Sequence, residues 1–129
     1  MRKILVLFIF AVLAMTSVAN VKGDKDVVYV MGASMSFKDS VVYFTEIQPI
    51  EGVSLIKGSK FLPHRQYYAY ELKDYMSFKE GMPGRTSVIY FSKKRSKLEK
   101  KEKSIKFKLV EREGMTVRYL GDKFKFTKP

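Results

Sequence analysis

The residues that could do chemistry in this chain are few, and their types restrict what it could catalyse. Its 129 residues include a single histidine, His64, and no cysteine. Cysteine nucleophiles, thiolate zinc sites, disulfide scaffolds and multi-histidine metal sites are therefore excluded. His64 has no nucleophile motif such as Gly-x-Ser-x-Gly beside it. It is interpreted as a surface residue in the first turn of a helix, not as a general base.

Two carboxylates, Glu71 and Asp74, lie three residues apart and could project together from one helix as an acid and a base. Lys73 and Lys79 are interspersed with them, which is typical of a charge-balanced, solvated helix face. The aspartates near the start of the chain lack the spacing of a calcium-binding loop. The sequence therefore predicts no catalytic residue, no metal ligand and no cofactor.

The distribution of charge gives a candidate binding site. The chain carries a net charge of +12, and its segment 93–108 holds nine basic and two acidic residues. Such a segment creates a positive potential that attracts anions and weakens as salt rises. The alternative is a lysine-rich helix that is merely well solvated. The predicted anion-binding residues are Lys93, Lys94, Arg95, Lys97, Lys100 and Lys101.

A helix over about 96–111 is predicted to hold this basic segment. Ser96 and Glu99 have the spacing of a capping box, in which two side chains bond the free amides at a helix start. Apolar residues recur at helical spacing on one face, which Glu102 interrupts. The alternation within residues 105–109 is also typical of a strand, which is the alternative for the second half. The apolar face comprises Leu98, Ile105 and Leu109.

A second helix is predicted from His64 to the glycines at 81–84, which stop it. Four residues at helical spacing form its apolar face: Tyr68, Leu72, Tyr75 and Met76. The two remaining tyrosines, Tyr67 and Tyr70, are expected to be exposed and could stack on sugar rings or bases.

Two strands precede these helices. The first covers 26–37, and Gly32 within it marks a bulge or a close backbone approach. The second covers 41–50 and should stop near Gln48, because Pro49 cannot donate to a strand ladder. A polar turn joins them into a hairpin.

Two more strands follow the helices, at 86–92 and 115–120, and residues 123–126 form a short terminal extension. The resulting order is ββαβαβ, which predicts a single α+β domain over 20–129. Its small mixed sheet contains the antiparallel hairpin and a parallel, right-handed crossover. The helices are expected to pack on one face of that sheet.

The start of the chain resembles a secretory signal peptide. Arg2 and Lys3 precede an apolar run over residues 4–15, and small residues at Ser17 and Ala19 follow it. A charged head, a short apolar stretch and a small-x-small exit are the three parts of such a signal. Residues 1–19 are therefore predicted to be removed on export, to the periplasm of a Gram-negative cell or to the exterior.

The mature chain is similar to small exported proteins of Bacteroides-type bacteria. The similarity rests on the strand TSVIYFS at 86–92, the segment VRYLGDKFKF at 117–126 and the helix that contains YELKDY. It implies export and a small α+β domain. That group has no assigned activity, so the resemblance supplies no functional residues.

These observations predict an exported, non-enzymatic binding protein whose basic segment engages an anionic lipid, an anionic glycan or an acidic protein. Basic helices often bind nucleic acid, but export removes the chain from the cytoplasm and lowers the rank of that ligand. Two alternatives stay open: a structural or assembly component of the cell envelope, and an enzyme with an unrecognised site.

Overall fold

The computed structural model describes residues 27–129, so the predicted signal peptide lies outside the described residues. A five-stranded sheet is built around β1 (Val27–Met35). One edge of β1 pairs along its length with β4 (Thr86–Ser92), antiparallel. The other edge pairs antiparallel with β2 (Val41–Phe44) and, further along, with β3 (Gln48–Glu51). The last strand, β5 (Thr116–Tyr119), runs parallel to β2, so the sheet is mixed as predicted.

A β-bulge separates β2 from β3, which are two halves of the strand predicted at 41–50. Phe44 lies opposite Ala33 and Gln48 lies opposite Val30, so three residues face two across the gap. The Thr45 amide donates to the Gly32 carbonyl at 2.9 Å. The Gly32 amide in turn donates to Thr45 Oγ1 at 2.8 Å, which closes the bulge.

The predicted stop near Gln48 is wrong. The strand continues through Pro49, which lies opposite Tyr29, to Glu51. Proline is tolerated here because, among residues 27–129, β3 is an edge strand that pairs with β1 alone.

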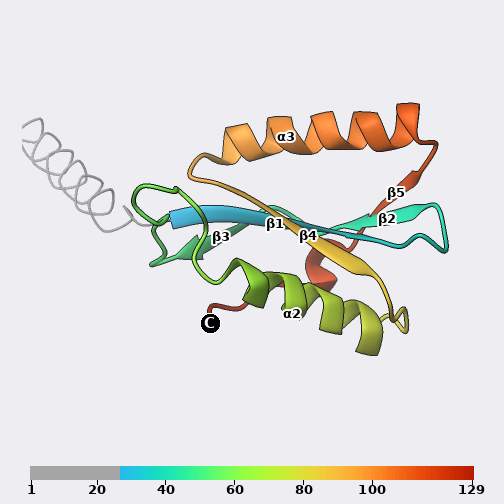
Figure 1. The fold of residues 1–129 in the computed structure, drawn as a ribbon, viewed down its shortest axis with the longest axis horizontal. Coiled ribbons are helices and arrows are strands. Elements are labelled where there is room, and N and C mark those ends of the chain that lie inside the picture. Colours follow the sequence, from blue (N-terminus) through green and yellow to red (C-terminus); the bar gives the residue numbers. More distant parts are fainter. Residues whose placement is uncertain (1–26) are drawn as a thin grey trace, which may run out of the picture.

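Helices α2 (Arg65–Phe78) and α3 (Arg95–Phe107) cover opposite faces of the sheet, with the strands between them (Figure 1). The prediction that both helices pack on one face is therefore wrong. The reason lies in β1, which is apolar on both faces, so each face needs its own cover. The α2 side buries Val28, Val30, Tyr68, Leu72 and Met76, and the α3 side buries Met31, Ala33, Val42, Phe44 and Leu98.

At Gly32 the side chain of Leu72 on α2 packs directly against the backbone of the sheet. A Cβ atom at this position would lie 2.7 Å from Leu72 Cδ2 and 3.3 Å from Ile89 Cδ1. The atoms that approach Gly32 closely are side-chain atoms and not another backbone, and the bulge belongs to the strand that faces it.

The predicted helix at 96–111 is confirmed, and the strand alternative is wrong. Residues of α3 continue directly into a π-helical segment, Lys108–Arg112. The capping box does not form, because Lys94 takes the N-cap position and no side chain caps the helix start. Ser96 therefore lies inside the first turn.

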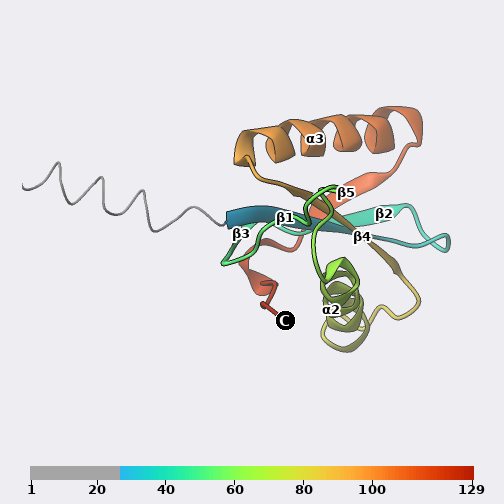
Figure 2. The same cartoon turned by 60° about the vertical axis from the view of Figure 1, so that its left-hand side comes forward.

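The segment after β5 contributes to the core. Gly121–Lys123 form a short 3-10 helix, after which Phe124 and Phe126 are buried against α2. Gln48 fixes this tail from both sides: its Nε2 donates to the Phe124 carbonyl at 3.2 Å, and its Oε1 accepts from the Phe126 amide at 2.7 Å. Figure 2 shows the chain ending on the α2 side of the sheet.

Helix α3 connects β4 to β5. These two strands run in the same direction, as the predicted crossover requires. Both are opposed to β1 in direction, yet β1 and β2 lie between them in the sheet. Within residues 27–129 no helix is both long enough and apolar enough to cross a membrane.

Candidate functional site

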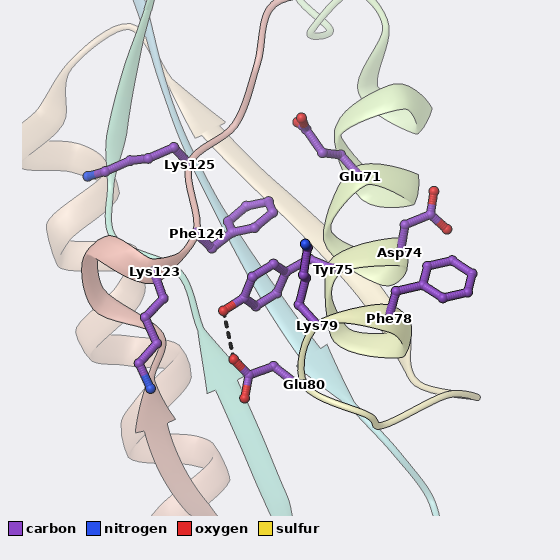
Figure 3. Close-up of a pocket in the computed structure, with 9 residues that line it drawn as sticks. All are labelled: Glu71, Asp74, Tyr75, Phe78, Lys79, Glu80, Lys123, Phe124 and Lys125. Atoms are coloured by element: carbon purple, nitrogen blue, oxygen red, sulfur yellow. Dashed lines mark hydrogen bonds between the residues drawn. The ribbon is translucent and has the colours of Figure 1, made fainter.

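A groove of about 700 Å³ lies between α2 and the C-terminal tail and contains both carboxylates singled out from the sequence (Figure 3). Glu71 accepts from the Thr127 amide at 2.9 Å, and its carboxylate also contacts the Thr127 hydroxyl. Asp74 is exposed and points away from Glu71. The structure therefore separates the proposed acid and base, and Glu71 instead holds the tail on α2.

The phenol in this groove is also engaged. Tyr75 Oη donates to Glu80 Oε2 at 2.6 Å, and burial together with the Glu80 carboxylate raises the pKa of Tyr75 to about 12. The Tyr75 ring packs edge-on against Phe124, with 5.1 Å between centroids. A phenol with such a pKa stays protonated at neutral pH, so this arrangement positions the tail and supplies no base.

His64 lies at the exposed N-cap position of α2, the surface position predicted for it. Tyr67 and Tyr70 are exposed as predicted, and Tyr68 is fully buried. Tyr67 Oη lies 2.9 Å from Thr127 Oγ1, so it also belongs to the contact between α2 and the tail.

All six predicted anion-binding residues are exposed, but α3 spreads them around its axis. Leu98 is buried against the sheet. Lys100, two residues further on, therefore projects from the opposite side of the helix. Lys93 precedes the helix. The structure thus divides the predicted cluster instead of gathering it into one patch.

One side of α3 carries a row of cations beside β4. Lys97 and Lys101 lie four residues apart on one side of α3, and Lys94 precedes them by three residues at the N-cap position. Lys101 Nζ lies 5.5 Å from the centroid of the Tyr90 ring on β4. The row is extended by Lys108 and Arg112 of the π-helical segment, which line a hollow together with Tyr90. We call these five residues the basic flank.

The other side of α3 faces β5 and contains both carboxylates of the helix. Glu99 Oε2 lies 4.0 Å from Arg95 Nε, and Glu102 Oε2 accepts from Tyr119 Oη at 3.5 Å. Glu102 interrupts the apolar face of α3, as the sequence indicated. Burial there raises the pKa of the Glu102 carboxyl. The lysines of the basic flank that lie on α3 therefore have no carboxylate of that helix beside them, whereas Lys108 and Arg112 share the hollow with Glu113.

The hollow at the end of the basic flank has a volume of about 380 Å³. Its apolar wall comes from Met35, Tyr90, Ile105 and Leu109, and its rim from Lys108, Arg112 and Glu113. The sequence predicts Lys108 only as the end of the basic segment 93–108, and it predicts neither this hollow nor the place of Arg112 beside it. The seven-residue interval from Lys101 to Lys108 was the available signal, since it places both on one helix side.

Among residues 27–129, no three acidic, histidine or cysteine side chains converge to hold a metal ion. Comparisons with protein-family models, with curated proteins and with solved structures found no match.

Proposed function

We propose that this is an exported, non-enzymatic binding protein that engages a polyanionic ligand through the basic flank. The observation that carries the proposal is the row of cations beside β4 without a carboxylate of α3 among them. Among the described residues, Arg95 is the member of the predicted cluster that has an ion pair, and it lies outside the flank.

A bound polyanion would relieve a cost that the free helix carries. Like charges at i,i+4, such as Lys97 and Lys101, destabilise a helix by about 0.2–0.5 kcal/mol for each pair. Exposed cations without a carboxylate partner also attract an incoming anion, and dissolved salt weakens this electrostatic attraction. Binding should therefore be strongest at low ionic strength.

The test is the triple substitution Lys94→Gln, Lys97→Gln and Lys101→Gln, assayed with poly-L-glutamate. Exposed charge pairs contribute about 0.2–1 kcal/mol each, so we expect a loss of roughly tenfold in affinity at low salt. Isothermal titration at two salt concentrations measures it. The matched control removes three exposed lysines elsewhere: Lys57, Lys73 and Lys79.

An equal loss in both triple variants would show that binding follows net charge and not the flank. Failure of the parent protein to bind poly-L-glutamate even at low salt would leave the flank as a feature of solubility. Either result would contradict the proposal.

Export is the second part of the proposal, supported by the three-part signal over residues 1–19. We expect the mature protein to begin at Asn20 or within a few residues of it. N-terminal sequencing of protein from the cell envelope or the medium measures this. An intact Met1 in that fraction would contradict export by cleavage.

An assembly component of the envelope is the second candidate function, and one observation favours it. Strand β4 pairs only with β1 among the described residues, so its other edge is unpaired. Unpaired edges are sites where a further strand can add.

A further inference from the structure

We propose that the ligand of the basic flank is an extended acidic peptide segment that adds as a strand to the outer edge of β4. This inference rests on the proposed function and names its partner. It joins two features that meet at Tyr90 of β4. One is the unpaired edge of that strand, and the other is the basic flank, whose Lys101, Lys108 and Arg112 lie around the Tyr90 ring.

The register of the sheet shows which backbone groups of β4 point outward. Gly32 directs both its N–H and its C=O toward Thr45, away from β4. Ile89 lies opposite Gly32, so its own N–H and C=O point away from β1. The direction alternates along a strand, and Ser87 and Phe91 therefore also present their backbone groups at the outer edge.

A single side chain bonds these outer groups in the part of the chain that the structure describes. Arg65 Nη2 donates to the Ile89 carbonyl at 3.1 Å, and its guanidinium carbon lies 5.7 Å from the Phe91 ring centroid. Charged side chains on a sheet edge are a common protection against unwanted strand pairing. Arg65 is itself exposed, so an added strand displaces it from Ile89 and can pair a carboxylate with it.

The surroundings of the edge determine the chemistry of the added strand. The chain turns back after β4, so α3 lies over one side of the edge and α2 over the other (Figure 1). Side chains of an added strand alternate between these sides. Those on the α3 side meet Lys97, Lys101 and Lys108 of the basic flank, which selects carboxylates at every second position. Those on the α2 side meet Arg65 and Phe91.

This arrangement favours a peptide over a lipid surface or a glycan. The outer groups of β4 alternate along seven residues with the spacing of a peptide backbone. A lipid headgroup or a sugar polymer can use the cations but cannot match that ladder. Strand addition takes its affinity from main-chain hydrogen bonds and its specificity from alternate side chains.

The decisive variant is Ser87→Pro, tested with a seven-residue peptide of alternating Glu and Val. Because the Ser87 N–H points outward, proline there removes an edge donor and spares the ladder to β1. We expect at least a tenfold loss of peptide affinity. Ser87→Ala is the matched control, since Ser87 Oγ is buried without a hydrogen-bond partner, and it should bind like the parent.

A second probe keeps the inference falsifiable if Ser87→Pro fails to fold, which circular dichroism reveals. The same peptide with every amide N-methylated keeps its charge but donates no backbone hydrogen bond to the strand edge, so it should bind the parent protein at least tenfold more weakly than the unmethylated peptide. Equal binding of the methylated and unmethylated peptides would overturn strand addition.

The outcomes separate this inference from the proposed function. Unchanged peptide binding by folded Ser87→Pro, together with loss in the Lys94, Lys97 and Lys101 triple variant, would overturn strand addition and leave the polyanion site standing. Absence of all polyanion binding would overturn both. Displacement of the bound peptide by vesicles of phosphatidylglycerol, unaffected by Ser87→Pro, would identify a membrane surface as the ligand instead.

Discussion

Replacing Phe126 by alanine is expected to lower the free energy of unfolding by about 3–5 kcal/mol, the usual cost of removing a buried phenylalanine ring. Phe126 is only 7 % exposed although it lies three residues before Pro129. Its ring packs edge-on against Tyr68 and Phe124, with centroids 5.8 Å and 4.9 Å away. Chemical denaturation followed by circular dichroism measures the loss.

Phe78→Ala provides the control, because Phe78 is 82 % exposed. Its replacement should lower the free energy of unfolding by about 0.5 kcal/mol or less. Similar, small losses in the two variants would contradict the assignment of the tail to the core. A large loss for Phe126 alone would show that the last residues are needed to cover the α2 side of the sheet.

The sequence contains a signal for this tail, although that signal alone predicts only a short extension. Phe124 and Phe126 alternate with Lys123 and Lys125, which is the period-two pattern of a segment with one buried face. The pattern spans too few residues to predict a strand, and none forms there. The partner of the tail, Gln48, lies far away in sequence, so no local pattern could have paired them.

Much of the fold follows from local patterns. The periodicity of Tyr68, Leu72 and Met76 correctly predicted which side of α2 is buried, and the glycines after it correctly predicted its end. Periodicity describes one element at a time, however. It shows that a helix has an apolar face but not which face of the sheet it covers, and the helices were therefore placed on the same side.

The candidate site shows the same division. Charge counting identified α3 as the basic element, and the exposure of its lysines is confirmed. Which lysines lie on the same side of α3 relative to β4 and β5 depends on the topology of the sheet. The edge of β4 depends on the topology as well, because TSVIYFS would look the same in a central strand.

Replacing Arg85 by methionine is expected to destabilise the fold by about 3 kcal/mol. Arg85 is 3 % exposed and had no role in the interpretation of the sequence. It donates to the hydroxyl and the carbonyl of Ser34 at 3.0 Å and 3.1 Å, to the Val41 carbonyl at 2.5 Å and to Asp39 at 2.9 Å. Each buried group left without a partner costs about 1–3 kcal/mol, and several would be left at once.

These bonds tie the start of β4 to the hairpin between β1 and β2. Arg85→Lys should recover only part of the loss, because an ammonium cannot reach several acceptors in the fixed geometry of a guanidinium. Arg95→Met is the matched control, since Arg95 is half-exposed and its partner Glu99 is 4.0 Å away. Equal stability of the Arg85 and Arg95 variants would contradict a structural role for Arg85.

The contact between Asp39 and Arg85 should also make the stability of the fold depend on pH in the acid range. The Val41 amide, followed by Arg85, holds the pKa of Asp39 below its ordinary value of 3.8. A carboxyl whose pKa is lowered by folding stabilises the folded state above its unfolded pKa, and this stabilisation is lost as the pH falls through the folded pKa. The parent protein should therefore lose stability in that acid range, and Asp39→Asn should lose less of it. Unfolding curves at pH 2 to 6 measure the difference, and identical pH profiles for the two proteins would show that Asp39 does not couple to folding.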